Sequence, residues 1–408
     1  MNWKLFVLAL VLLRAVWDFV LNRVQLRSAN NPTPENLKDV YDEKTYDNWK
    51  RYSADKCRLN FVSTAVTVAV TVLLLVFNVH AAVAALFGAN VYVQMLAVVI
   101  FQALVDALCG AAFSYYDSFV IEQKYGFNKS TKKTFVMDQL RGFIINVLLS
   151  GVLMALLALL YRGMGDWVVL LFTAAVFLIT LVISFLAPYL MRVGNKFVPL
   201  EEGELRQKLQ KLLTDHGYQV KEIQVMDASR RTTKLNAAFT GFGKTKTVIL
   251  YDNLLSAMDT DEICAVFAHE LGHGLNRDVP KMQGMNLLNL LVMAVTVWLC
   301  VRIPALHEAF GFGEVNYGFA YILLGVGLGI VQPLTGLFMN GYSRRAEFRA
   351  DHQALKENYG AALCTALKIL ARENFAHLAP AKLLVKLEYS HPPIGDRIAA
   401  IEKAISRK

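Results

Sequence analysis

Charged residues are scarce in this chain of 408 residues: they make up 18% of it, whereas hydrophobic residues make up 55%. Soluble domains contain about a quarter charged residues, so the composition disfavours an ordinary soluble protein. The five cysteines include no C-x-x-C pair, which excludes a regular disulfide framework. Lys and Arg outnumber Asp and Glu by 42 to 33, but their distribution along the chain fits a membrane protein better than a nucleic-acid-binding one.

Long apolar stretches dominate the sequence, and seven of them reach the roughly 20 residues needed to cross a bilayer. They lie near residues 5–24, 60–84, 92–119, 143–162, 167–190, 284–303 and 318–340. Arg14 and Asp18, in the first stretch, are four residues apart and can pair on one helical face. Asp106 and Asp117, in the third, either face the interior of the helix bundle or water, or are snorkelling or paired structural carboxylates.

The basic residues lie in alternate loops. Loop 23–58 carries eight Lys or Arg residues and loop 120–142 carries five, whereas loop 85–91 carries none. Positively charged loops stay in the cytoplasm, so we expect the N-terminus outside and residues 191–283 and 341–408 in the cytoplasm. This predicts four regions: a membrane region of five helices (1–190), a first cytoplasmic segment (191–283), transmembrane helices six and seven (284–340) and a second cytoplasmic segment (341–408).

The two cytoplasmic segments are together large enough for one small α+β domain. The pattern predicts a helix at 201–215, strands in "VKEIQVMD" (220–227) and "TKTVILYD" (245–252), and a turn at Gly241 and Gly243 between them. A long helix is expected from about Asp261, with Asp259 as its N-cap and Glu262 as capping-box partner. The predicted fold is a polytopic all-α membrane protein with a small cytoplasmic α+β domain.

That long helix contains His269, Glu270 and His273 in the pattern H-E-x-x-H. Histidines four residues apart share one face of a helix and can bind one metal ion, and the glutamate next to the first can act as a general base on a water. This is the arrangement of zinc hydrolases. The alternative is a helix that carries two surface histidines and a glutamate by chance.

A catalytic zinc ion needs a third protein ligand. Glu347 in "SRRAEFRADHQA" (343–354) is the candidate, and Asp351, one turn further along the predicted helix, could orient a ligand histidine. On spacing alone, a charged helix surface is the better explanation of these residues, with Arg344, Arg345 and Arg349 as solvated partners.

Four motifs, in this order, resemble the type I CAAX prenyl endopeptidases: "EQKYGFNKST" (122–131), "HELGH" (269–273), "SRRAEFRAD" (343–351) and "SHPPIGDR" (390–397). The resemblance runs over most of the chain. It implies seven helices around a large intramembrane chamber, which gives Asp106 and Asp117 a polar space to face, and Glu347 as third ligand of one zinc ion. It also implies hydrolysis of lipid-modified peptide or protein substrates near their C-terminus.

The resemblance also implies roles for residues outside the zinc motif. His391 and Arg397 match a histidine and an arginine beside the zinc, where both could stabilise an oxyanion. Asn236 and Ala237 match a strand edge that holds the substrate backbone extended. Without the resemblance, His391 and Arg397 would be interpreted as the start of an ordinary surface helix.

Two other functions remain open at this point. A seven-helix transporter or channel fits the composition but leaves the H-E-x-x-H motif unexplained. A membrane quality-control metalloprotease shares that motif and needs no prenyl group. We expect a zinc endopeptidase in the endoplasmic reticulum membrane of a eukaryote, or in the cytoplasmic membrane of a bacterium, with its catalytic domain in the cytoplasm.

Overall fold

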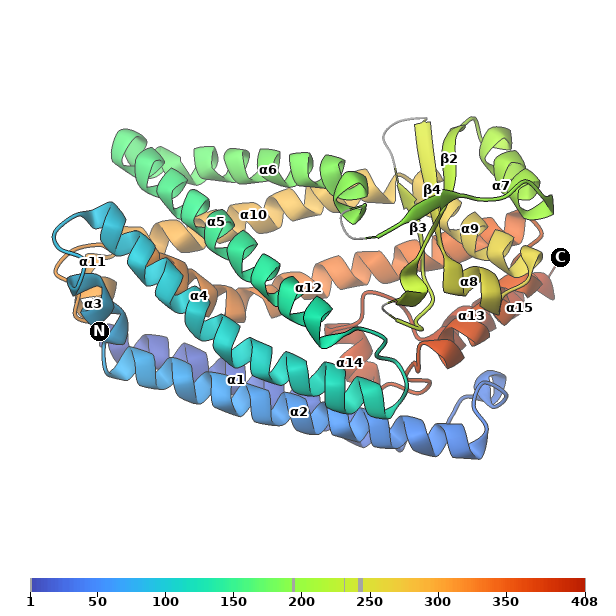
Figure 1. Cartoon of the computed structure of the whole chain (residues 1–408), viewed down its shortest axis with the longest axis horizontal. Coiled ribbons are helices and arrows are strands. Elements are labelled where there is room, and N and C mark those ends of the chain that lie inside the picture. The colour runs from blue at the N-terminus through green and yellow to red at the C-terminus, as the bar shows by residue number, and fades with distance from the viewer. Residues whose placement is uncertain (1, 193–194, 231, 241–244, 408) are drawn as a thin grey trace.

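A bundle of long helices forms one end of the molecule, and a small sheet with shorter helices forms the other (Figure 1). The computed structural model describes residues 2–192, 195–230, 232–240 and 245–407. Within them the long helices are α1 (Trp3–Ser28), α2 (Glu43–Val76), α4 (Val91–Tyr116), α5 (Lys132–Met164), α6 (Val168–Met191), α10 (Asp278–Arg302) and α12 (Tyr317–Lys356). Short helices α3 (Val79–Ala85) and α11 (Pro304–Glu308) lie at the end of the bundle where the chain begins (Figure 1).

By length and hydropathy, six segments in the described part of the chain can span a membrane. The fourth, Lys132–Ser184, contains α5 and most of α6, which a 3-10 turn at Gly165–Trp167 separates. The predicted stretches therefore correspond to seven helices. One boundary differs from the prediction: the second stretch ends at Val76, because Asn78 adopts a left-handed conformation (φ 54°) and the chain turns into α3.

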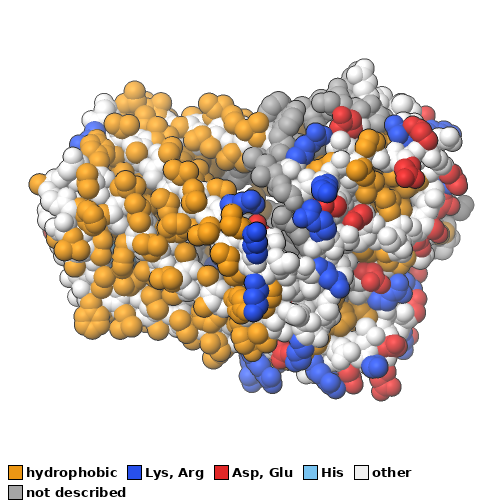
Figure 2. Space-filling model, in the orientation of Figure 1, with side chains coloured by type: hydrophobic (Ala, Val, Ile, Leu, Met, Phe, Trp, Pro, Cys, Tyr) orange, Lys and Arg blue, Asp and Glu red, His pale blue; other side chains and the backbone are white. Residues whose placement is uncertain are grey.

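The surface of the bundle is apolar, as a lipid-facing surface must be. Large side chains point outward along it, among them Leu108, Leu148, Leu159 and Phe338. Figure 2 shows that hydrophobic side chains cover this end of the molecule and that Lys and Arg gather where the apolar surface stops. Basic side chains at this border match the position of lipid headgroups.

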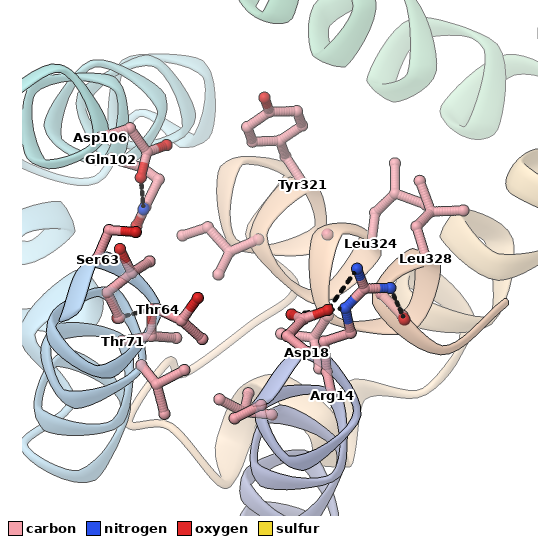
Figure 3. Close-up of a pocket in the computed structure, with 18 residues that line it drawn as sticks. Arg14, Asp18, Ser63, Thr64, Thr71, Gln102, Asp106, Tyr321, Leu324 and Leu328 are labelled. Carbon is pink, nitrogen blue, oxygen red and sulfur yellow. Dashed lines mark hydrogen bonds and ion pairs between the residues drawn. The ribbon is translucent and has the colours of Figure 1, made fainter. Parts of the chain in front are cut away.

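A cavity of about 600 Å³ lies inside the bundle, between α1, α2, α4 and α12 (Figure 3). Arg14 and Asp18 line it and pair as predicted, with 2.9 Å between Arg14 Nη2 and Asp18 Oδ1. Asp106 also lines it and accepts a hydrogen bond from Gln102. Asp117 does not line this cavity; it pairs with Lys56 of α2 at 2.6 Å, which matches the alternative of a paired structural carboxylate.

Arg14 also replaces a backbone hydrogen bond that is missing from α12. Pro333 lies inside that helix and has no N–H, so the carbonyl of Gly329, four residues earlier, loses its usual donor. Arg14 Nη1 donates to this carbonyl oxygen at 2.9 Å (Figure 3). An unsatisfied carbonyl is costly inside a membrane, so the proline of one helix accounts for the arginine of another.

We expect Arg14→Met to lower the free energy of unfolding by about 1–2 kcal/mol, the size of one such hydrogen bond and of the lost partner of Asp18. Unfolding in detergent micelles measures this loss. The loss should shrink when Pro333 is replaced by alanine, because residue 333 then offers its own N–H to Gly329. An equal loss in both backgrounds would contradict the explanation.

The other end of the molecule contains a four-stranded sheet in the order β1-β2-β4-β3. Its strands are β1 (Phe197–Pro199), β2 (Gln219–Met226), β3 (Ala237–Thr240) and β4 (Thr245–Tyr251). The two predicted strands are β2 and β4, which pair in parallel, while β3 pairs antiparallel with β4 at the sheet edge. The turn predicted at Gly241 and Gly243 lies outside the described residues.

Helices α7 (Glu204–Asp215), α8 (Asp252–Ala257), α9 (Thr260–Leu275), α13 (Gly360–Glu373), α14 (Lys382–Leu387) and α15 (Ile394–Ile405) complete this end. The predicted capping box is present at the start of α9: Asp259 accepts from the Glu262 N–H, and the Glu262 side chain accepts from the Asp259 N–H. Helix α12 continues without a break from the bundle to Lys356, so one rigid element connects the membrane region to the small domain.

Candidate active site

Helices α9 and α12 cross at very short range, and Gly272 makes this possible. A Cβ atom at this position would lie 2.8 Å from the Cα of Ala350, which is closer than van der Waals contact permits. The glycine of "HELGH" therefore lets the two backbones come into contact. Glu347, one turn before Ala350 on α12, is thereby brought to the histidine face of α9.

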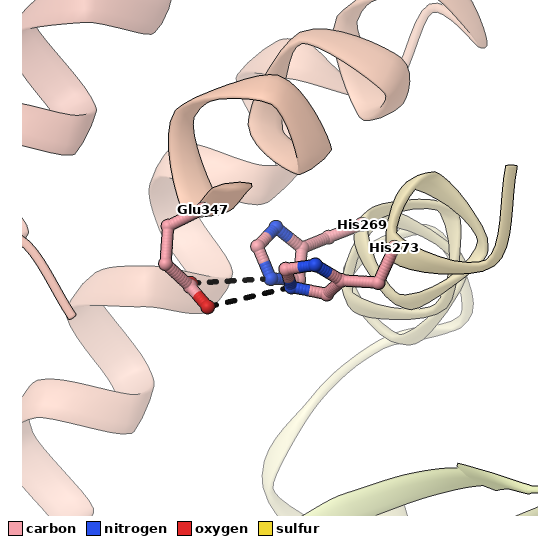
Figure 4. A group of neighbouring side chains, drawn as sticks. All are labelled: His269, His273 and Glu347. Atoms are coloured by element: carbon pink, nitrogen blue, oxygen red, sulfur yellow. Dashed lines mark ion pairs between the residues drawn. The ribbon is translucent and has the colours of Figure 1, made fainter. Parts of the chain in front are cut away.

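Three side chains converge at this crossing: His269, His273 and Glu347 (Figure 4). Glu347 Oε2 lies 3.4 Å from His269 Nε2, and Glu347 Oε1 lies 3.3 Å from His273 Nε2. Tetrahedral zinc with bonds of about 2.0 Å requires its ligand atoms to be about 3.3 Å apart. Glu347 Oε2 is buried and makes no hydrogen bond among the described residues. These three residues fit a zinc ion.

Carboxylates hold the other ring nitrogen of each histidine. His269 Nδ1 lies 2.9 Å from Asp351 Oδ1, and His273 Nδ1 lies 3.0 Å from Asp278 Oδ2. Both Nε2 atoms are therefore directed at the metal position, as carboxylate–histidine–metal arrangements require. Burial opposes the charged form of both imidazoles, but the hydrogen bonds outweigh it and raise the pKa of His269 and, to about 9, that of His273. Because zinc binds neutral imidazole, metal uptake must displace the additional proton from each charged ring.

Arg397 lines the cavity onto which the candidate ligands open, but its contacts are with the carboxylates around them. It is 7% exposed, and its Nε and Nη2 donate to the two oxygens of Asp351 at 2.9 and 2.6 Å. Its Nη1 lies 3.2 Å from Glu347 Oε2. The guanidinium thus ties Asp351 to Glu347 and offsets the negative charge that two buried carboxylates bring together. These contacts favour a positioning role for Arg397 over direct contact with an oxyanion.

A cavity of about 430 Å³ opens onto the three candidate ligands. Glu270 lines it from α9, half-buried and outside the group of three. His391 lines it from the loop before α15; its side chain is 63% exposed, and its Nε2 lies 3.3 Å from Glu347 Oε1. A carboxylate and an imidazole outside the group of three are therefore available beside the position that a metal ion would take.

Asn236 and Ala237 line the same cavity at the start of β3. The Tyr251 N–H donates to the Asn236 carbonyl, so the backbone of Asn236 faces β4. Successive residues of a strand point their N–H and C=O groups to opposite sides, and Ala237 therefore presents its groups to the open edge. In this structure the Asn236 side chain accepts the Ala237 N–H at 2.9 Å. The structure brings together every site residue predicted from the sequence.

Comparison with known proteins identifies the family to which the chain belongs. Residues 23–192 match "CAAX prenyl protease N-terminal, five membrane helices", and residues 199–405 match "Peptidase family M48". The chain belongs to peptidase family M48. It is a metalloprotease and an integral, multi-pass membrane protein, which decides against a transporter or channel.

The similarity to M48 relatives covers nearly the whole chain. A CAAX prenyl protease 1 homolog of rice is 32% identical over 416 residues, covering 98% of each protein. CAAX prenyl protease 1 of Saccharomyces cerevisiae is 25% identical and covers 100% of this chain and 96% of its own length. The crystal structure of S. mikatae Ste24p superposes with a TM-score of 0.92 over 98% of this chain and 99% of its own, at 24% identity, which shows a common fold.

The structure also contains site residues that the sequence analysis missed. Asp278 holds His273 and itself accepts hydrogen bonds from Tyr342 and Arg349, each at 2.8 Å. Asp278 can reach His273 because Arg277, between α9 and α10, adopts a left-handed conformation (φ 53°) that turns the chain back toward α9. The aspartate five residues after the motif was the only available signal, and spacing alone does not reveal a turn of that kind.

Proposed function

We propose that this M48 metalloprotease binds one zinc ion through His269, His273 and Glu347 and cleaves prenylated CAAX-type substrates near their C-terminus. The observation that carries the proposal is the distance of each histidine Nε2 to the nearer Glu347 oxygen, 3.4 Å for His269 and 3.3 Å for His273, which is close to the ligand spacing of tetrahedral zinc. The prenyl part rests on the relatives, which are named CAAX prenyl proteases, and on the place of the site beside the membrane helices.

Each residue has a task in the proposed reaction. A zinc ion at this position supplies Lewis-acid activation of water and of the scissile carbonyl. Glu270 accepts a proton from the attacking water and passes it to the leaving amine. His391 donates a hydrogen bond to the oxygen that becomes negative, while Asp351, Asp278 and Arg397 keep the ligands in place.

The substrate backbone is proposed to extend the sheet. Its carbonyl and N–H groups would pair with Ala237, after the Asn236 side chain releases the Ala237 N–H. An extended peptide on this edge runs along the 430 Å³ cavity past Glu270. We also propose that 191–283 and 341–408 form one catalytic unit interrupted by the hairpin 284–340, since α9 packs against both α12 and α13.

Metal analysis tests the ligand set. Purified protein is expected to contain about one zinc per chain, and His269→Ala, His273→Ala or Glu347→Ala should each lose most of it. Asp278→Asn should retain the ligands but bind zinc about 10- to 100-fold more weakly, because it orients His273 without contacting the metal position. Full zinc occupancy in Glu347→Ala at limiting free zinc would refute the proposed third ligand.

We further propose that the small domain faces the cytoplasm and that the loop around Gly88 lies on the opposite side. The basic loops 23–58 and 120–142 lie at the same end of the molecule as the sheet (Figure 1). A cysteine at Gly88 should react with an impermeant thiol reagent applied from outside, and one at Lys208 should not. Reaction of Lys208→Cys in sealed cells or microsomes of known orientation would reverse the assignment.

A further inference from the structure

The chain that enters β3 is held from its open side by one asparagine. The Leu235 N–H donates to Asn374 Oδ1 at 2.8 Å, and Asn374 Nδ2 donates to the Leu235 carbonyl at 3.3 Å. A single side-chain amide therefore takes both backbone groups of Leu235, as the next strand of a sheet would. Asn374 lies at the C-cap of α13 and lines the same cavity as Glu270 and His391.

Because backbone groups alternate in direction along an extended chain, the Asn374 side chain lies on the edge that is proposed for the substrate. The backbone of Asn236 faces β4, so its two neighbours, Leu235 and Ala237, face the opposite way. Asn374 occupies the edge at Leu235, and among the described residues no strand pairs with β3 on this side from Ala237 onward. A peptide that pairs with Ala237 cannot continue past Leu235 without displacing Asn374.

The position of Asn374 is fixed by the residue that follows it. Phe375 adopts a left-handed backbone conformation (φ 54°), which costs a residue other than glycine about 1 kcal/mol or more. Its ring packs against Tyr52 and Phe127, with centroids 5.5 and 5.2 Å away, and its carbonyl accepts from Trp49 Nε1 at 3.1 Å. These contacts offset the strain and hold the end of α13 against the membrane region.

The same chain segment is held on its other flank. Thr232 forms an isolated β-bridge with Asn128, and Asn253 Nδ2 donates to the Lys234 carbonyl at 2.8 Å. Asn128 and Phe127 belong to the "EQKYGFNKST" motif, to which the catalytic chemistry assigns no task. The motif therefore takes part in fixing the entry to β3.

We propose that Asn374 is a positioning residue that ends the open edge of β3 and so sets the register in which an extended peptide meets Glu270. The inference rests on the proposed function, because it takes β3 as the substrate strand. Register decides which peptide bond lies at the metal position, and a shift of one residue would present the other face of the strand. Asn374 thereby contributes to the choice of cleavage site.

Asn374→Leu tests the inference, because leucine has a similar size and makes neither hydrogen bond. Loss of the two hydrogen bonds that hold Leu235 leaves the start of β3 less ordered and its edge without a fixed end, so KM for a peptide should rise about tenfold, with a smaller change in kcat and full zinc content. Mass spectrometry of the products should detect cleavage at a neighbouring bond as well. Asn374→Asp, which keeps only the acceptor, should fall between the wild type and Asn374→Leu.

Asn316→Ala is the matched control, since it also removes a side-chain acceptor of a backbone N–H, at the far end of α12. It should lower stability and leave KM and the cleavage site unchanged. Unchanged KM and a single cleavage site in Asn374→Leu would overturn the inference, and the zinc-dependent activity of the wild type would still support the proposed function.

Hydrogen exchange provides a readout that does not depend on activity. The Leu235 amide should exchange at least about tenfold faster in Asn374→Leu than in the wild type, because it loses its acceptor. Unchanged protection at Leu235 would refute the inference even if the protein proved to cleave nothing. Absence of zinc and of peptide cleavage in the wild type would instead refute the proposed function.

Discussion

Glu270→Gln should retain zinc and lower kcat/KM for a peptide substrate on the order of 1,000-fold, within the range that general base catalysis contributes. Glutamine has nearly the same shape but cannot accept the proton of the attacking water. Glu270 lines the cavity beside His269 and His273 and does not belong to the group of three candidate ligands, so the metal should stay in place. Hydrolysis of a fluorogenic peptide and metal analysis of the same preparation measure both quantities.

Glu262→Gln, on the same helix, provides the control. Glu262 accepts a hydrogen bond from the N-cap backbone, which glutamine can also do, so its activity should stay at the wild-type level. Full activity in Glu270→Gln would remove Glu270 as the base. In the same assay, His391→Ala should lower kcat on the order of 100-fold with zinc retained, as expected for loss of one transition-state donor. Arg397→Met should also weaken zinc binding, because it releases Asp351 and Glu347.

Local sequence signals predicted the parts of the site that depend on one helix. The spacing of His269 and His273 and the capping box of Asp259 and Glu262 follow from helical periodicity, and the structure contains both. The length of the apolar runs predicted seven helices, alternation of apolar and polar residues predicted β2, and β-branched content predicted β4. Glu347 was different: its spacing alone favoured a charged helix surface, and only the resemblance to a family selected it before the crossing of α9 and α12 was visible.

Contacts between distant parts of the chain could not be predicted in this way. Asp278 reaches His273 only because of a left-handed residue at the turn, and the polar contact between Asn374 and Leu235 spans 139 positions. Arg14 was predicted to pair with Asp18, but its bond to the Gly329 carbonyl follows from a proline on another helix. Each of these side chains supplies a hydrogen-bond partner to a backbone or imidazole atom, and which atoms lack one becomes visible only after the helices pack.

The position of the site relative to the membrane leads to the second large effect. Helix α10 begins at Asp278, five residues after His273, and Glu347 lies seven residues beyond the predicted end of the last membrane stretch at Asn340. At about 1.5 Å per residue, seven residues correspond to about 10 Å. A substrate that carries a lipid at its C-terminus can therefore keep the lipid in an apolar environment while its backbone lies along β3.

A farnesylated CAAX peptide should accordingly be cleaved with a kcat/KM at least about 100-fold higher than its unmodified form. Burial of about four CH₂ groups contributes about 3 kcal/mol, which corresponds to about 100-fold in affinity, and a farnesyl chain offers more than that. The comparison is made well below KM and below the concentration at which the lipidated peptide forms micelles. A peptide methylated on the same cysteine controls for the blocked thiol and should behave like the unmodified one.

The same experiment separates the two proteases that the sequence leaves open. A membrane quality-control enzyme recognises an extended, accessible backbone, and equal kcat/KM values for the two peptides would support it over the prenyl-dependent enzyme. Lipid recognition adds binding energy away from Glu270, so the 100-fold preference should persist in the residual activity of Asn374→Leu, whose defect concerns the backbone. A preference that disappeared in this variant would mean that the lipid acts by placing the peptide on β3 rather than by adding affinity of its own.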